Sequence, residues 1–224
     1  MEADVRKDLL SAQQAAWNDL ARPGSWWTAD ERLELASIAR LAIADPEPLP
    51  PWVGVSSTDR LDPAAVPAVA ADAAYRIARH AGTMTETVYR SVADEIGELR
   101  YVELCSVVSA VAAVVSFHRA AGTVPPPFPE PTAGEPTGER PDDVVAAELN
   151  WVPVAAPADQ TAAVVQAYSA VPGAMRTTWT LARAQYIPED EMGQPDWMRR
   201  PDGLTRPEAE LVAARVAQLR ECFY

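Results

Sequence analysis

A helical spacing of apolar residues runs through nearly the whole chain. Apolar side chains recur at intervals of three and four residues, and alternating β-branched runs are few. The pattern predicts helices over residues 3–20, 29–44, 64–81, 85–97, 99–121, 158–170, 173–186 and 206–220. We therefore expect an all-α protein.

Three of the predicted helices begin with the sequence of a capping box. In this motif a Ser or Thr and a Glu three residues later satisfy the first free amides of the helix. The three sequences are TADE at 28–31, TMTE at 83–86 and TRPE at 205–208. Pro207 falls in the first turn of the last helix, where the N–H that it lacks has no helical partner anyway.

Two proline-rich segments interrupt the helical pattern. The longer one, TVPPPFPEPTAGEPTGERP at 123–141, has no period and is expected to be an extended connector on the surface. The shorter one, DPEPLPPW at 45–52, divides the first half. WVPV at 151–154 is expected to be a short extended segment that docks on the helices. These breaks suggest three parts: a helical unit at 1–122, a connector at 123–156 and a second helical unit at 157–224.

Composition and charge then narrow the class of protein. Apolar residues make up 48% of the 224 residues, which is enough for a buried core. The net charge of −13 argues against nucleic acid or an anionic membrane as a partner. The start MEADVRKDLL has no apolar leader, and serines interrupt the apolar stretch at 107–117. We expect a cytoplasmic protein, and two cysteines cannot form a disulfide scaffold.

A weak internal repeat relates the two helical units. When residues 102–118 are aligned with 209–224, Glu103 falls over Glu210. Twelve residues after each glutamate stand Val115 and Cys222, and the first copy has His118 three residues further on. The alignment suggests two degenerate repeats.

The cysteines and Glu210 each allow more than one interpretation. Cys105 lies within an apolar helix and is best explained as a small buried hydrophobe. Cys222 could be the same, or a thiol of lowered pKa if a new helix began there. Redox chemistry would then require a second thiol three residues further on, at position 225. Glu210 is either an ordinary acid in a first helical turn or an inward-facing base for a thiol proton.

The C-terminal segment resembles a known redox family. LTRPEAELVAARVAQLRECFY is similar to the core of the alkylhydroperoxidase D / carboxymuconolactone decarboxylase superfamily. In its redox-active members a glutamate precedes the first cysteine of C-x-x-C by twelve residues, which is the spacing of Glu210 and Cys222. The wider chain resembles alkylhydroperoxidase-related (seleno)proteins, through DLARPGSWWTADER (19–32), FHRAAG (117–122), FPEPTAGEPTGERP (128–141), WVP (151–153) and ECFY.

The resemblance implies an alkylhydroperoxidase D-like helical bundle with thiol- or selenol-dependent peroxidase activity. It implies that Cys222 is the resolving thiol, that a peroxidatic cysteine or selenocysteine stands at 225, and that a relay histidine follows one turn later. Glu210, with water and that histidine, would remove the proton from residue 225. The implied partners are a hydroperoxide substrate, a lipoyl- or thioredoxin-like dithiol reductant and further copies of the chain. No metal and no cofactor is implied.

Because selenocysteine is encoded by UGA, we hypothesise that the reading frame continues past Tyr224 through such a codon. UGA is also a common genuine stop in GC-rich genomes, so a true terminus is the alternative.

Two other functions remain open at this stage. The first is a non-enzymatic scaffold or oligomerisation module of the same fold. In it His118 is either a structural residue or, with Glu103, a proton relay in the degenerate repeat. The second is decarboxylase-like acid–base chemistry at Glu103 and His118 or at Glu210, which would survive replacement of Cys222 by Ser.

If the peroxidatic residue stands at position 225, these 224 residues lack the nucleophile and should show little or no turnover of hydroperoxide. A hydroperoxide-consumption assay measures this directly. Robust activity from the chain would contradict the assignment of Cys222 as a resolving thiol only.

Overall fold

The computed structural model describes residues 5–45, 61–147, 150–155, 163–187, 191–198 and 203–219. The expected all-α fold is confirmed. Within the described residues the only β pairing consists of two isolated antiparallel bridges, Val145 with Val154 and Met198 with Thr205. The elements are α1 (Lys7–Asp19), α2 (Ala29–Ala44), α3 (Ala68–His80), the 3₁₀ turn η1 (Ala81–Thr83), α4 (Glu86–Ile96), α5 (Glu98–Ala121), α6 (Ala163–Gln166), α7 (Pro172–Gln185) and α8 (Arg206–Leu219).

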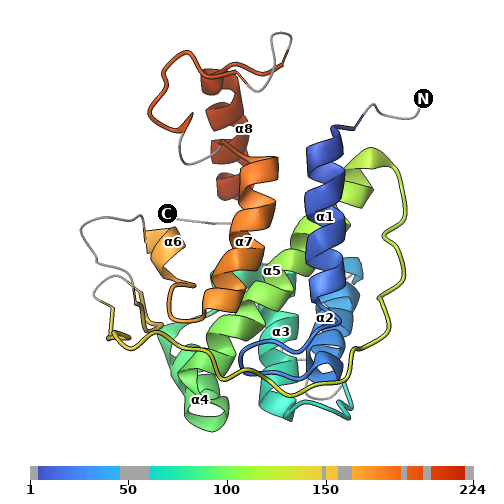
Figure 1. Cartoon of the computed structure of the whole chain (residues 1–224), viewed down its shortest axis with the longest axis vertical. Helices are drawn as coiled ribbons and strands as arrows, with labels where there is room; N and C mark the ends of the chain where they lie inside the picture. The colour runs from blue at the N-terminus through green and yellow to red at the C-terminus, as the bar shows by residue number, and fades with distance from the viewer. Residues whose placement is uncertain are drawn as a thin grey trace.

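α5 is the central helix of the bundle. It packs against α1, α2, α3, α4 and α7, so its apolar residues face neighbours on most sides (Figure 1). Among the described helices α5 is the one long and apolar enough to cross a membrane. Because Leu104, Val107, Val111 and Val114 are almost fully buried in the core, we interpret α5 as a core helix.

α7 belongs to the same core as the helices of the first unit. It lies beside α1 and α5 in Figure 1, and Leu181 joins the main apolar cluster. The side chain of Thr177 donates a hydrogen bond to Asp19 at 3.0 Å, and Ser106 donates to the carbonyl of Ala174 at 3.3 Å. The proposed boundaries at 122 and 157 therefore do not separate two cores among the described residues.

Most predicted helix boundaries agree with the structure to within two residues, but α1 and α3 each begin four residues later than predicted, at Lys7 and Ala68. At α1 the described residues 5 and 6 precede the helix. At α3 the start is displaced by contacts with α2. The amides of Ala64, Ala65 and Val66 donate to the carboxylate of Glu34 at 2.6–2.8 Å instead of starting the helix. Pro67 is then the N-cap, since proline restricts the residue before it to extended conformations.

The helix predicted at 158–170 is much shorter where it is described. α6 covers Ala163–Gln166, and residues 158–162 lie outside the described part of the chain. Ser169 donates to the carbonyl of Gln166, and the chain then turns so that Pro172 can begin α7.

One of the three capping boxes forms in full. Thr28 and Glu31 bond reciprocally at the start of α2. At α8, Glu208 accepts the N–H and hydroxyl of Thr205, both at 2.8 Å, and Pro207 lies in the first turn as expected. The prediction at 83–86 was wrong, because Thr85 is the N-cap of α4 and bonds to the amide of Val88. Thr83 instead closes the turn η1 by donating to the carbonyl of His80.

The connector at 123–141 is extended and runs along the outside of the bundle, as predicted (Figure 1). Trp17 of α1 holds its first half, because the indole N–H donates to the carbonyl of Pro127 at 3.0 Å. Phe128 stacks on the Trp17 ring at 4.6 Å between centroids, and the guanidinium of Arg40 lies 4.2 Å from the centre of the Phe128 ring. The connector is therefore attached to the helices rather than a free linker.

The second half of the connector is held by the α1–α2 loop (residues 20–28). The amides of Thr132, Thr137 and Gly138 donate to the carbonyls of Ala21, Gly24 and Ser25 at 2.8–3.0 Å. WVPV follows as an extended segment, where Val154 is buried and Trp151 stacks on Tyr89 with centroids 6.2 Å apart.

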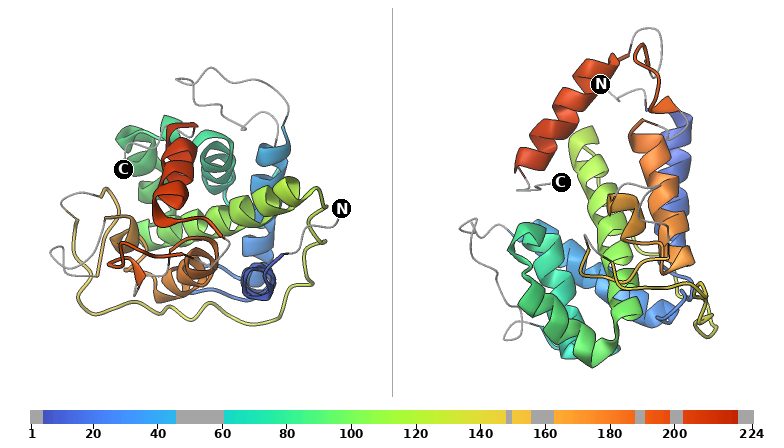
Figure 2. Two further views of the ribbon diagram at one scale, coloured as in Figure 1. Left: turned by 90° about the horizontal axis from the view of Figure 1, so that it is seen from above. Right: turned by 90° about the vertical axis from the view of Figure 1, so that its left-hand side faces the viewer.

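α8 stands apart from the packed bundle (Figure 2). It has no buried residue, and no extensive helix–helix contact involves it within the described residues. Leu211, Val212, Val216 and Leu219 are more than half exposed. α8 therefore differs sharply from α5, its partner in the proposed repeat.

Candidate functional site

Glu103, one of the candidate acid–base residues, is almost completely enclosed. Its side chain is 3% exposed, and Oε2 accepts the amide N–H of Trp26 at 2.7 Å. A Cβ atom on Gly24 would lie 1.6 Å from Oε1 of Glu103. Position 24 therefore requires glycine, because the α1–α2 loop closes directly over this carboxyl group and leaves no room for a side chain.

Arg32 of α2 is the basic partner of Glu103. Its Nε lies 3.5 Å from Oε1, which is ion-pair distance but without hydrogen-bond alignment. The same guanidinium donates through Nη1 to the carbonyls of Asp19 and Arg22 at 2.8 and 2.7 Å, and through Nη2 to the carboxylate of Asp19 at 2.9 Å. Arg32 thus binds the end of α1, the loop and α5 at once.

Burial raises the pKa of Glu103 above its ordinary value of 4.5. The charge of Arg32 and the amides of Trp26 and Ser25 lower the pKa of Glu103, but their combined effect is smaller than the effect of burial. Because protein atoms cover the carboxyl group, a substrate could reach it only if the loop opened. We interpret Glu103 as a group that positions the loop.

His118 lies near the C-terminal end of α5. Its Nδ1 is 2.8 Å from the hydroxyl of Thr123, just after Gly122 ends the helix with φ +69°. Glu103 and His118 are fifteen residues apart on one continuous helix, which separates them by about 22 Å along its axis. The structure therefore does not bring the proposed Glu103–His118 relay together.

Glu210, in contrast, has a partner suited to proton chemistry. Its carboxylate accepts a hydrogen bond from the phenol of Tyr186 and lies 3.5 Å from Nη2 of Arg206. Burial, together with the hydrogen bond to the carboxylate, raises the pKa of Tyr186 to about 12. Tyr186 consequently stays protonated at neutral pH and donates to Glu210.

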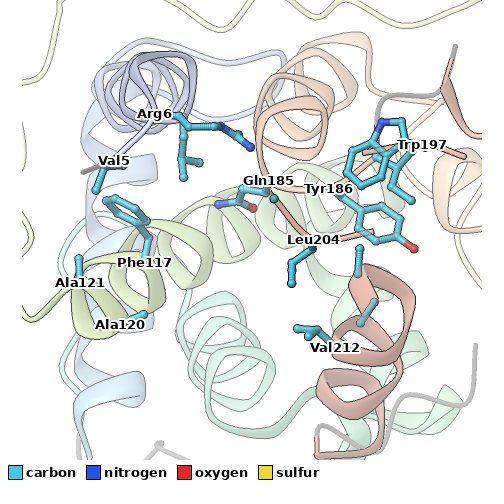
Figure 3. Close-up of a pocket in the computed structure, with 15 residues that line it drawn as sticks. Val5, Arg6, Phe117, Ala120, Ala121, Gln185, Tyr186, Trp197, Leu204 and Val212 are labelled. Carbon is cyan, nitrogen blue, oxygen red and sulfur yellow. The ribbon is translucent and has the colours of Figure 1, made fainter. Parts of the chain in front are cut away.

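Tyr186 also lines a cavity of about 560 Å³ between α8 and the bundle (Figure 3). The wall comes from the start of α1, the end of α5, the end of α7, the segment after it and α8. Most lining side chains are apolar: Val5, Leu9, Phe117, Ala120, Ala121, Ile187, Trp197, Leu204, Ala209, Val212 and Ala213.

Of the two cysteines, the structure describes Cys105 but not Cys222. Cys105 is partly buried, as expected, and burial raises the pKa of its thiol to about 12, so it is inert at neutral pH. Cys222 lies outside the described residues. From Glu210 the described part of α8 rises about 14 Å to Leu219. A direct proton transfer between Glu210 and Cys222 of one chain would thus require the residues after Leu219 to turn back.

Comparisons with known proteins give no further assignment. No protein-family description, curated protein or solved structure matches the chain. Among the described residues, no group of three or more His, Cys, Asp or Glu is placed to hold a metal ion.

Sequence reasoning missed several residues around the cavity. Arg6 and Gln185 line it, Tyr186 bonds Glu210, and Trp197 is buried in its wall. Tyr186 ended a predicted helix and Arg6 lay within a polar N-terminal turn, so neither stood out in the periodic pattern. Their roles depend on helix ends meeting in space, which spacing along the chain does not encode.

Replacing Glu103 by Gln should alter how stability depends on pH. Because the folded-state pKa of Glu103 is raised, its contribution to stability is present below its ordinary pKa of 4.5 and is lost as pH rises towards the folded value. The wild type should therefore lose stability relative to Glu103→Gln over that window, by at most about 1.4 kcal/mol per pH unit. Urea unfolding of both proteins between pH 4 and 8 measures the difference. A constant difference, or a gain by the wild type as pH rises, would contradict the raised pKa.

Proposed function

We propose that this chain is a thiol-dependent oxidoreductase with an alkylhydroperoxidase D-like helical bundle, and that it acts with hydroperoxides. In this proposal Cys222 is the resolving thiol and Glu210 is the acid–base group. The supporting observation is the hydrogen bond from Tyr186 to Glu210. Tyr186 lines an apolar cavity, and Glu210 is on α8, the helix that precedes Cys222 in the sequence.

Glu210 provides both halves of a proton transfer in the proposed reaction. A peroxidatic thiol or selenol attacks the O–O bond and becomes a sulfenic or selenenic acid, with release of an alcohol or water. The Cys222 sulfur then attacks that sulfur or selenium and hydroxide leaves. Glu210 accepts the proton of the Cys222 thiol through a chain of water molecules and returns it by the same route to the leaving hydroxide, which departs as water. A dithiol reductant, lipoyl- or thioredoxin-like, then reduces the bond and becomes a disulfide.

Tyr186 supports this role of Glu210 by fixing the carboxylate. As a donor whose pKa is raised to about 12, it cannot compete for the proton at neutral pH. Arg206, one turn before Glu210 on α8, pairs with the same carboxylate at 3.5 Å. Cys105 is unsuited to the reaction, since burial raises its pKa to about 12.

A second candidate is a non-enzymatic helical module that assembles through α8. The observation that favours it is the exposed apolar surface of α8, formed by Leu211, Val212, Val216 and Leu219. A homo-oligomer would cover that surface, and it is compatible with either candidate.

Thiol–disulfide exchange at Cys222 distinguishes the two candidates. In a Cys105→Ser background, Cys222 should react with oxidised lipoamide at pH 7 about tenfold faster than free cysteine, because a base helps to form the thiolate. Glu210→Gln should remove most of that advantage. Intact-mass spectrometry of quenched samples gives the rates.

Glu208→Gln is the matched control. Glu208 lies on the same helix as Glu210, but its carboxylate bonds to Thr205 at the start of α8. It should leave the exchange rate unchanged. If Cys222 reacts like free cysteine, with the same rate in both variants, the oxidoreductase proposal fails and the module is favoured.

A further inference from the structure

We propose that the cavity between α8 and the bundle binds an apolar monocarboxylate, with Arg6 pairing with the carboxylate group. The inference deepens the proposed function by naming a class of molecule. Only the reaction of a bound hydroperoxide rests on the proposed function, because binding of the carboxylate can be measured by itself.

The size and lining of the cavity suit the apolar body of such a ligand. Its volume of about 560 Å³ is within the range of small-molecule pockets. Phe117 and Ala120 from α5 face Leu204 and Val212 across it (Figure 3). The buried ring of Trp197 forms part of the wall. An alkyl or aryl group would be removed from water on all these sides.

Arg6 is the only charged residue among the described residues that line the cavity. Its side chain points towards Gln185 in Figure 3 and is 28% exposed. Nε bonds Asp8 at 3.1 Å, and Nη2 donates to the carbonyl of Ala184. Nη1 has no partner among the described residues, so one edge of the fork is available to a ligand.

The charges around Arg6 favour a carboxylate over other polar groups. Arginine pairs with carboxylates through parallel N–H donors, and one guanidinium matches one negative charge. Asp8 competes only weakly, because it is 58% exposed and its ion pair with Arg6 is screened by water. α1 begins next to Arg6, so its positive end adds to the attraction. In a chain with net charge −13, a doubly charged phosphate would meet stronger repulsion.

The position of Tyr186 connects this site to the proposed chemistry. Its ring lines the cavity, while its hydroxyl bonds Glu210. A carboxylic acid bound with its head at Arg6 would place its chain beside Tyr186, the hydrogen-bond partner of Glu210. A hydroperoxide of such an acid is therefore the substrate class that the cavity fits.

Isothermal titration calorimetry with decanoate, decanol and decyltrimethylammonium tests the site on the full chain. Wild type should bind decanoate about tenfold more tightly than decanol, and the cation more weakly still. Arg6→Gln should abolish the preference for decanoate while it leaves decanol binding unchanged. Arg176→Gln, which removes an exposed arginine paired with Glu139 on another part of the bundle, should behave like wild type.

A second variant tests the apolar wall without touching Arg6. Ala120→Trp should fill the cavity and weaken decanoate and decanol alike, with an unchanged circular dichroism spectrum. Equal binding of decanoate and the cation, an unchanged preference in Arg6→Gln, or full binding in Ala120→Trp would each overturn the proposal.

Cys222→Ser separates this inference from the thiol chemistry, because it should bind decanoate like wild type. If the wild-type chain shows accelerated Cys222 exchange but does not bind decanoate, the carboxylate site is rejected and the thiol function stands. Normal binding without accelerated exchange would reject the thiol function alone.

Discussion

The enclosed pair of Glu103 and Arg32 is the interaction on which the rest of the bundle depends. A carboxyl group buried in the central helix needs partners, because an unpaired buried charge destabilises a fold by several kcal/mol. Arg32 supplies the charge, and the α1–α2 loop supplies amides by closing over the carboxyl group at Gly24. The loop carbonyls in turn accept the amides of the connector. One buried acid thereby holds α1, α2, α5 and the connector in register.

This arrangement divides the molecule into a tightly held bundle and a more loosely attached α8. The bundle shares a continuous apolar core that includes α7. α8 is held mainly at its start, where Glu210 meets Tyr186 and Arg206 donates to the carbonyls of Met192 and Gln194. Segments with few buried contacts open at low free energy, and ligand-binding elements are commonly of this kind. The cavity and the hydrogen bond between Tyr186 and Glu210 both lie where the two parts meet.

Local patterns in the sequence were sufficient to predict most of the helices, the capping box at residues 28–31 and the extended connector. These depend on neighbours a few residues away, so spacing alone encodes them. The repeat was less informative, because Glu103 and Glu210 share a pattern but not an environment. Glu103 is enclosed by a loop, whereas Glu210 is 43% exposed and bonds to Tyr186. The partners of each, Arg32 for Glu103 and Tyr186 for Glu210, come from distant segments that periodicity does not relate.

Native-state amide hydrogen exchange, followed by NMR, tests the central claim most directly. If the buried pair holds the α1–α2 loop, the amide of Trp26 should exchange only through global unfolding, as core amides of α5 do. The amides of α8 should exchange through local opening at a much lower free energy. Exchange of Trp26 as fast as that of α8 would contradict the account, and so would protection of α8 at the global level.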